Sequence, residues 1–290
     1  MFRPLKALAA LVLGLAVMAG SPALAQPAMW VIKDHDSTIY LFGTVHLLKP
    51  ETKWRTSKYD EAFKSADEVW LEINDSDDMA AMQTLIMQIG MDPANPLSKK
   101  LSPEEYKRFS DAANKVGLPP AAADPMKPWM AGIMLSAMPM LKAGYDPNSG
   151  VESVIKGDSK VGSKPVRAFE TSEQQLRFFD SLPVPLQVEF LMSAVDDLDD
   201  GPAVLDKLVA DWSKGDLKAL EDDMVTPMRN DYPALYKVLL VDRNAAWAVS
   251  LEERLKGKGV SFVAVGSAHL IGPDSVQALL AKRGIKAERF

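Results

Sequence analysis

Two apolar runs that end in the same short motif place the strongest constraint on the fold of this chain. Residues 261–265 (Ser-Phe-Val-Ala-Val) lead into the Gly-Ser-Ala-His sequence that ends at His269, and residues 38–42 (Thr-Ile-Tyr-Leu-Phe) lead into the Gly-Thr-Val-His sequence that ends at His46. Apolar runs rich in β-branched and aromatic residues, bounded by turn residues, predict buried strands. Each histidine is therefore expected at the carboxyl end of its strand, where the sites of α/β proteins form.

Histidine is rare in this chain, so the occurrence of two Gly-x-x-His motifs is informative. The chain has three histidines, and two of them stand in a Gly-x-x-His motif after an apolar run. A glycine there permits a tight turn or a close backbone approach. Because imidazole is the commonest metal ligand and the usual acid or base near neutral pH, the pair predicts a metal or catalytic site. The alternative is two unrelated histidines at strand-to-loop junctions.

The first 25 residues have the pattern of a secretory signal peptide. Arg3 and Lys6 precede an apolar stretch over residues 7–19, and Ala-Leu-Ala at 23–25 provides a small-x-small cleavage site before Gln26. We therefore expect a mature single domain over residues 26–290 that is periplasmic or secreted. The alternative is an uncleaved anchor. No later segment is apolar over a length that spans a bilayer, so no transmembrane anchor is expected after cleavage.

The composition excludes several classes of function. The chain has no cysteine, which rules out disulfides, thiolate metal sites and a cysteine nucleophile, and leaves imidazole and oxygen as possible metal ligands. Its 33 Lys and Arg face 39 Asp and Glu, giving a net charge of -6, and the basic residues are not concentrated in any segment. A nucleic-acid partner is therefore not expected, because nothing would neutralise phosphates.

The first third of the chain predicts strands of a parallel sheet. Residues 29–33 and 38–44 form a predicted hairpin with His35 at an exposed turn, and a helix at 57–66 is followed by a strand at 69–74. A right-handed crossover would place Glu72 of that strand near His46. Because a carboxylate in an apolar strand is costly to bury without a partner or a cation, Glu72 is a candidate site residue. The alternative is an edge strand on which Glu72 faces solvent.

The remaining pattern is largely helical. Residues 77–144 predict methionine-rich helices, which form either an adaptable binding face or ordinary core. A short strand at 164–171 ends with Glu170, and Glu152 either joins the site or is an acid favoured by the helix dipole at a helix start. Helices are expected over 178–256, and a last strand over 286–290. The predicted fold class is α/β, with a mixed sheet formed by strands from both ends of the chain and a large helical insert.

Several of these segments together resemble the TraB/GumN family. They are residues 38–46, 71–72, 150–152, 169–171, 242–244 and 262–269. That family is related to the TIKI metalloproteases and, more distantly, to the erythromycin-esterase and ChaN-like proteins. The resemblance implies two related halves whose Gly-x-x-His strands meet. It also implies a site of two histidines, a glutamate and an arginine, and TIKI-like members are divalent-metal peptidases that favour manganese or cobalt.

By this resemblance, His46 and His269 match the motif histidines, and Glu72 and Arg243 match the family's acid and arginine. Glu170 and Glu152 match its mid-chain acids. The expected protein is an exported, metal-dependent, peptidase-like hydrolase.

In the expected mechanism, one or both of His46 and His269, together with Glu72 or Glu170, hold Mn, Co or Zn, with His46, His269 and Glu72 as the first choice of ligands. The other carboxylate serves as the base, and Arg243 stabilises the oxyanion or a substrate carboxylate. Arg243 could instead form a buried salt bridge.

Two alternatives to this mechanism stay open. One is a metal-independent hydrolase of small esters, in which a histidine acts as general base and a glutamate orients it. The other is a non-catalytic envelope protein that binds a peptide or haem through the histidines. The substrate is accordingly expected to be a peptide or a small ester.

Overall fold

The computed structural model describes residues 26–290, and the predicted signal peptide at 1–25 lies outside the described residues. The strands are β1 (Met29–Lys33), β2 (Ser37–Thr44), β3 (Glu68–Leu71), β4 (Val166–Ala168), β5 (Gly259–Gly266) and β6 (Glu288–Arg289). The helices are α1 (Ser57–Ser65), α2 (Met79–Ile89), α3 (Leu97–Lys100), α4 (Pro103–Val116), α5 (Pro120–Ala123), α6 (Pro128–Lys142), α7 (Val151–Val161), α8 (Ser172–Asp180), α9 (Val184–Asp196), α10 (Gly201–Lys214), α11 (Leu217–Leu220), α12 (Thr226–Asp231), α13 (Pro233–Tyr236), α14 (Asp242–Leu255) and α15 (Val276–Lys282). Short 3-10 turns η1 (Pro147–Ser149) and η4 (Ser267–Leu270) and π-helical turns η2 (Glu221–Val225) and η3 (Lys237–Val241) complete the chain.

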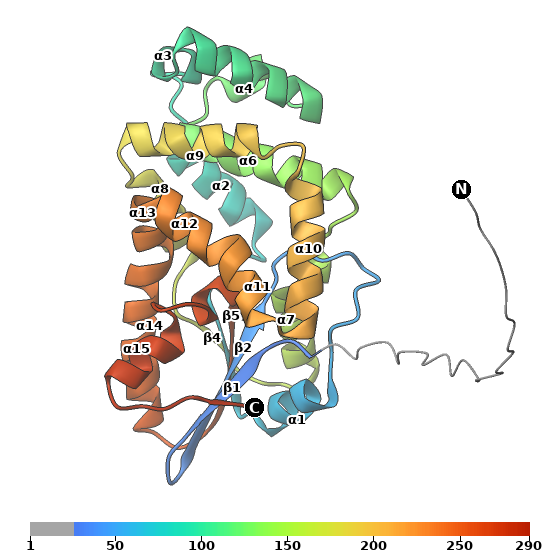
Figure 1. The fold of residues 1–290 in the computed structure, drawn as a ribbon, viewed down its shortest axis with the longest axis vertical. Coiled ribbons are helices and arrows are strands. Elements are labelled where there is room, and N and C mark those ends of the chain that lie inside the picture. Colours follow the sequence, from blue (N-terminus) through green and yellow to red (C-terminus); the bar gives the residue numbers. More distant parts are fainter. Residues whose placement is uncertain (1–25) are drawn as a thin grey trace, which may run out of the picture.

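The sheet is mixed, and its strands come from both ends of the chain, as predicted (Figure 1). Its order is β4-β3-β5-β2-β1-β6. Strands β2, β5, β3 and β4 are parallel, whereas β1 and β6 add antiparallel pairs at one edge. The predicted hairpin at 29–44 is confirmed. The expected crossover from β2 to β3 does not join neighbours, because β5 lies between them and pairs with both.

This topology gathers four strand ends at one edge of the sheet. Thr44 pairs with Gly266, so the two Gly-x-x-His strands run side by side. Leu71 pairs with Ala264 on one side and with Ala168 on the other. Strands β3 and β4 are shorter than predicted and end at Leu71 and Ala168, so Glu72 and Glu170 follow strands and do not lie within them. The carboxylates are thereby free to turn in toward the strand ends.

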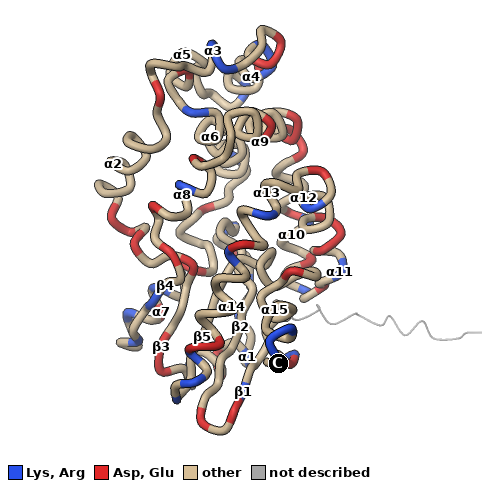
Figure 2. The backbone as a smooth tube through the Cα atoms, turned by 90° about the vertical axis from the view of Figure 1, so that its left-hand side faces the viewer, with Lys and Arg blue, Asp and Glu red and all other residues tan. Residues whose placement is uncertain are grey.

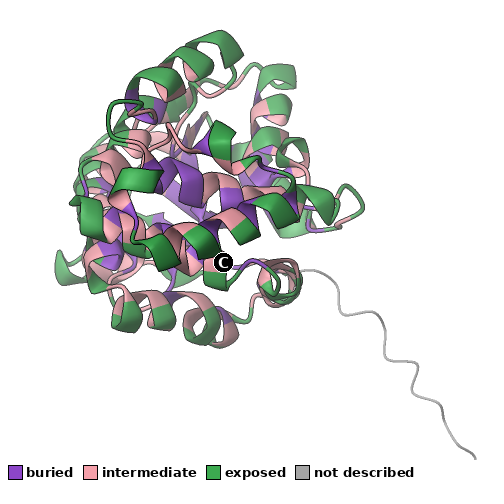
Figure 3. Ribbon diagram, turned by 90° about the horizontal axis from the view of Figure 1, so that it is seen from above, coloured by how far each residue is buried: buried purple, intermediate pink, exposed green. Residues whose placement is uncertain are grey.

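Helices cover both faces of the sheet (Figure 1). On one face, α1 and α7 pack aromatic and aliphatic side chains such as Tyr59, Phe63 and Ile155 against Phe42 and Phe262. On the other face, α14 and α15 pack against the remaining strand side chains, with Trp247 and Leu280 in this second cluster. Viewed from above, buried positions lie in the interior and exposed positions form the rim (Figure 3). Successive side chains of each strand point to opposite faces of the sheet and thus contribute to the two hydrophobic cores in turn.

The helical insert has its own core beyond the carboxyl edge of the sheet. Helices α4, α6 and α9 enclose Phe109, Leu135 and Leu191 (Figure 1). Pro183 lies between α8 and α9 and separates them, as the sequence Pro-Val-Pro at 183–185 indicates. Among the methionines of the insert, Met130 is buried in the core and Met79 is exposed.

The distribution of charge and the character of the helices can be compared with the sequence. Lysines and arginines are scattered along the chain among the acidic residues and do not gather into one basic stripe (Figure 2). Within residues 26–290, no helix has both the length and the apolar character needed to cross a membrane.

Candidate functional site

The carboxyl edge of the sheet brings together side chains that are far apart in the sequence. Glu72 follows β3, Glu170 follows β4, His46 follows β2 and His269 lies in the turn η4 after β5. Arg243 reaches the same place from the first turn of α14. These five predicted residues therefore meet at one location, and the sixth candidate, Glu152, joins them beside His46.

Arg243 is the centre of a buried polar network. Its Nη2 donates to Glu72 Oε2 at 2.6 Å and to Glu170 Oε2 at 2.8 Å, and its Nε donates to Glu170 Oε1 at 3.0 Å. Its Nη1 donates to the Leu239 carbonyl and to His269 Nε2, both at 3.1 Å. A guanidinium has five N–H donors, and all five have partners here. The side chain is only 10% exposed, so this arrangement fits a structural ion pair more directly than contact with a substrate.

The two glutamates are also fully engaged, and each is 8% exposed. Glu72 Oε1 accepts the backbone N–H of Gly266 at 2.7 Å, so this carboxylate links β3 to β5. Glu170 Oε1 accepts the indole N–H of Trp247 at 3.0 Å. The side-chain amide of Gln175 donates to an oxygen of each glutamate at 3.0 Å. These bonds provide the pairing that buried carboxylates require.

The network keeps its members in fixed charge states. Burial opposes ionisation of Glu72, but His269, His46, Arg243 and the Gly266 N–H together hold the pKa of its carboxyl well below the usual range. Burial likewise opposes the charge of Arg243, and the two glutamates raise the pKa of Arg243 above its ordinary value despite it.

His269 is a neutral and fully hydrogen-bonded imidazole. Burial is the main reason that its pKa falls to about 3. The Asn244 amide nitrogen donates to the Asp274 carbonyl, so the Asn244 oxygen faces His269 Nδ1 at 2.6 Å and must accept its proton. Nε2 therefore carries the lone pair and accepts from Arg243. The ring also stands 4.3 Å from that of Trp247, centroid to centroid.

His46 differs from the rest of the site because it is 65% exposed. Its Nδ1 lies 2.7 Å from Glu152 Oε1, and the same carboxylate accepts the Thr44 hydroxyl. Pairing with Glu152 raises the pKa of His46 to about 9. Although burial opposes it, His46 in turn lowers the pKa of Glu152. Within residues 26–290, His46 Nε2 has no hydrogen-bond partner.

Two glycines make room for this arrangement. A Cβ on Gly150 would lie 2.1 Å from the His46 carbonyl oxygen, so only glycine allows the start of α7 to approach the first motif and deliver Glu152. A Cβ on Gly266 would lie 3.1 Å from Glu72 Oε1 and 3.2 Å from His46 Nε2. The second Gly-x-x-His glycine therefore leaves a small space into which a carboxylate oxygen and an imidazole nitrogen both point.

The predicted metal ligands do not converge as arranged. A tetrahedral or larger site needs at least three ligand atoms about 2.0–2.3 Å from the ion. His269 Nε2 is occupied by Arg243, and it lies 3.8 Å from Glu72 Oε1. In the described part of the chain, the group of acids and histidines that brings three ligand atoms within 4.8 Å of one another is Asp34, His35 and Asp36, at the exposed hairpin turn. His46, His269 and Glu72 would fit an ion only if Arg243 withdrew, so metal binding by these residues stays a prediction.

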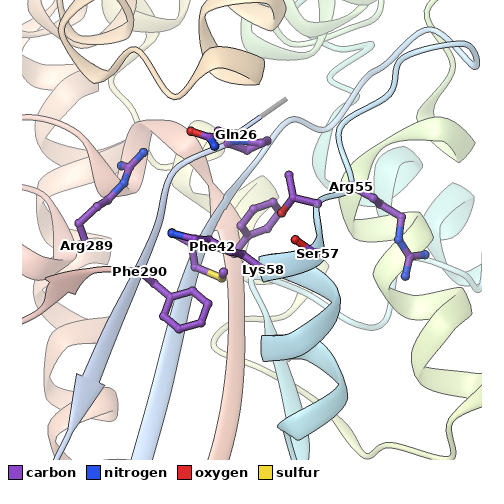
Figure 4. A pocket seen from close by; sticks show the side chains of 10 residues that line it. Gln26, Phe42, Arg55, Ser57, Lys58, Arg289 and Phe290 are labelled. Atoms are coloured by element: carbon purple, nitrogen blue, oxygen red, sulfur yellow. The ribbon is translucent and has the colours of Figure 1, made fainter. Parts of the chain in front are cut away.

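An apolar pocket of about 270 Å³ adjoins His46. Its walls come from the two Gly-x-x-His turns and from α10, α11 and η2. It is lined by Thr44, Val45, His46, Leu47, Leu205, Leu208, Trp212, Leu220, Met224, Gly266, Ser267, Ala268 and His269. A larger hollow of about 480 Å³ lies elsewhere, between Gln26, the beginning of α1 and the end of β6, and is lined partly by Arg55, Lys58 and Arg289 (Figure 4). None of the predicted site residues lines that hollow.

Sequence reasoning missed three members of the site. Gln175 had no signal, since a glutamine in the first turn of a helix is typical of the surface. Asn244 lies beside Arg243 in a segment that carried the family resemblance, but nothing in the sequence indicated its bond to His269. Trp247 stands one helical turn after Arg243, so the spacing places both on one face of α14 and was a usable signal. His35 is at an exposed turn, as predicted.

These features define an α/β domain in which a saturated arginine–carboxylate network ties the strand ends together and leaves one histidine–glutamate pair accessible. The chain belongs to the TraB/PrgY/gumN family, whose sequence model matches residues 28–289. It is similar, at 22% identity over 282 residues, to a protein of Treponema pallidum (strain Nichols) described as an uncharacterized protein. The match covers 88% of this chain and 80% of that relative. No solved structure matches the chain.

Proposed function

We propose that this chain is a hydrolase of esters or amides whose general base is His46, oriented by Glu152. The observation that supports the proposal is that His46 is exposed, whereas Arg243, its two glutamates and His269 are buried and hydrogen-bonded to one another. The donors of Arg243 and the nitrogens of His269 are occupied, and the two buried glutamates are tied to fixed partners. His46 instead offers an exposed Nε2 beside an apolar pocket. A carboxylate on Nδ1 fixes the tautomer that leaves Nε2 able to accept a proton.

In the proposed reaction, His46 Nε2 takes a proton from water as the water oxygen bonds to the substrate carbonyl carbon. The tetrahedral anion lies beside the imidazolium formed in this step. It collapses with cleavage of the carbon–oxygen or carbon–nitrogen bond, and the imidazolium returns the proton to the leaving group. Glu152 stabilises the imidazolium and holds the ring. Because Glu152 raises the pKa of His46 to about 9, the rate should rise with pH through the neutral range.

A divalent-metal hydrolase is the second candidate. The observation in its favour is the space beside Gly266, toward which His46 Nε2 and Glu72 Oε1 both point. A bound Mn, Co or Zn ion would supply Lewis acidity and a more acidic water. In that case Glu152 would orient His46 from behind, as carboxylates commonly do for ligating histidines.

The test compares wild type with His46→Gln and Glu152→Gln on a panel of p-nitrophenyl esters and short peptides. We expect a loss of about 10²–10⁴-fold in kcat/KM for His46→Gln, the range typical of a general base. His35→Gln is the matched control, because His35 lies in an exposed turn. Equal activity of wild type and His46→Gln would refute the proposal.

Metal content and chelation separate the two candidates. Activity that survives chelation, in protein without bound metal, supports the metal-independent base. Stoichiometric metal that is lost in both His46→Ala and His269→Ala, together with loss of activity on chelation, supports the metal-dependent candidate.

We further propose that the protein is exported, on the strength of the signal-like pattern at 1–25. A mature protein that begins at Gln26 and fractionates with the periplasm or the medium is the expected result. Retention of the first 25 residues on a cytoplasmic protein would contradict it.

A further inference from the structure

The apolar pocket beside His46 is held in place by the first Gly-x-x-His strand. Leu205, Leu208 and Trp212 are spaced three and four residues apart, so they lie on one face of α10. The Trp212 indole is buried and donates to the Gly43 carbonyl at 2.8 Å. This bond fixes α10 against the end of β2, and the pocket therefore exists before any ligand arrives.

The lining of the pocket is apolar apart from the site itself. Among the described residues that form it, none is Asp, Glu, Lys or Arg, and its polar side chains are Thr44, Ser267 and the two motif histidines. Leu205, Leu208 and Met224 are only half-buried, although they are large and apolar. Away from His46, a charged group placed here would lose its hydration without gaining a partner. An apolar group would instead complete the burial of these three side chains.

The size of the pocket limits what can enter it. Its volume of about 270 Å³ lies just below the range of about 300–1,000 Å³ that is usual for whole drug-sized ligands. It therefore has room for an apolar group such as a leucine, methionine or phenylalanine side chain. Because His46 lines the same pocket, a group seated there would place its neighbouring carbonyl beside Nε2.

We propose that this pocket is a specificity pocket that binds a large aliphatic or aromatic side chain next to the bond to be cleaved. The inference rests on the proposed hydrolase function and narrows its substrates to esters or peptides of apolar residues. In hydrophobic pockets, each methylene changes kcat/KM by about 10-fold or more. We therefore expect N-acetyl-leucine and N-acetyl-phenylalanine p-nitrophenyl esters to exceed the glycine ester by at least about 100-fold in kcat/KM.

A binding experiment tests the pocket apart from catalysis. The His46→Gln protein is titrated with N-acetyl-leucine amide and N-acetyl-glycine amide, and binding is followed by calorimetry or by NMR. We expect the leucine amide to bind at least about 10-fold more tightly than the glycine amide. Equal affinities would overturn the proposal. Selective binding in a protein whose wild type shows no turnover would uphold the pocket and refute the hydrolase.

Variants of α10 test whether the preference for apolar side chains arises in this pocket. Leu208→Trp should fill the pocket and reduce leucine-amide binding at least about 10-fold, whereas Leu208→Ala should enlarge it and favour phenylalanine over leucine. Val204→Trp is the matched control, because Val204 is an exposed position on the same helix outside the lining. Thermal unfolding confirms that each variant folds. Unchanged selectivity in both Leu208 variants, or an equal effect of Val204→Trp, would overturn the assignment.

Discussion

Removal of the Arg243 side chain should destabilise the protein strongly and in a pH-dependent way. In Arg243→Leu, Glu72 and Glu170 stay buried at 8% exposure, and the cation that pairs with both is gone. Breaking a buried ion pair by removing one partner costs about 3–5 kcal/mol. Since domains are stable by only about 5–15 kcal/mol, this is a large share of the free energy of unfolding. We expect the midpoint of thermal unfolding to fall by roughly 6–20 °C, at about 2–4 °C per kcal/mol for a domain of this size.

The pH dependence distinguishes a charge effect from lost packing. In wild type, the pKa of Glu72 is depressed, so its contribution to stability is present above the unfolded value of 4.5 and is lost as pH falls through the folded value. In Arg243→Leu, burial would oppose ionisation of Glu72 without the arginine to offset it, so the pKa of Glu72 should rise. Glu72 would then be neutralised more readily at pH 5, so the cost of the substitution should be smaller at pH 5 than at pH 7.5.

The assay is urea unfolding followed by tryptophan fluorescence at pH 7.5 and pH 5, with Arg55→Leu as the matched control. Arg55 also pairs with two carboxylates, Asp60 and Asp158, but it is 45% exposed. We expect its loss to cost no more than about 1 kcal/mol. A loss for Arg243→Leu that is equally small, or one that does not change between the two pH values, would refute the reasoning.

Three further predictions follow from the geometry. Glu152→Gln should move the acidic limb of the pH–rate profile from about 9 toward the ordinary histidine value of 6.5, because Glu152 is the main cause of the raised pKa of His46; an unmoved limb would count against His46 as the base. Gly150→Ala should lower the unfolding midpoint in calorimetry, because its Cβ would overlap the His46 carbonyl, whereas Gly157→Ala, which meets nothing within 4 Å in α7, should raise stability by about 0.5–1 kcal/mol. Since the pKa of His269 falls to about 3, the unfolded state binds more protons than the folded state between pH 6.5 and 3. The free energy of unfolding should therefore fall as the pH drops through that window. In His269→Gln, the free energy of unfolding measured by denaturant titration should depend less steeply on pH over the same window.

Much of the carboxyl edge could be predicted, because it depends on local patterns. Apolar runs that end in glycine identified β2 and β5, and the strand-helix-strand pattern placed Glu72 near the strand end that carries His46, while Glu170 was predicted at the end of its own strand. Parallel strands bring such ends to one edge whatever their order. The meeting of these residues therefore followed from the alternation of strands and helices alone.

The function of each side chain could not be predicted in the same way. From the sequence, Arg243 was expected to bind an oxyanion or a substrate carboxylate, with a buried salt bridge as the alternative, and only the pairing of all five N–H donors favours the salt bridge. The Gln175 and Asn244 bonds depend on how α8 and α14 pack against the sheet, which no local pattern encodes. The position of β5 between β2 and β3 also depends on tertiary structure, because the apolar sequences of these strands do not specify which strands pair.

The position of β5 has a consequence for how the protein is made. The Ser267 hydroxyl donates a hydrogen bond to the Thr44 backbone carbonyl at 2.8 Å, although the two residues are separated by 223 positions in the chain. Until β5 has been synthesised, β2 and β3 each lack their central neighbour and present an open edge of the kind that pairs wrongly with other chains. High contact order of this type slows folding. A nascent chain should therefore need a holding chaperone, and neither the network around Arg243 nor the second motif can form until the last segment has been synthesised.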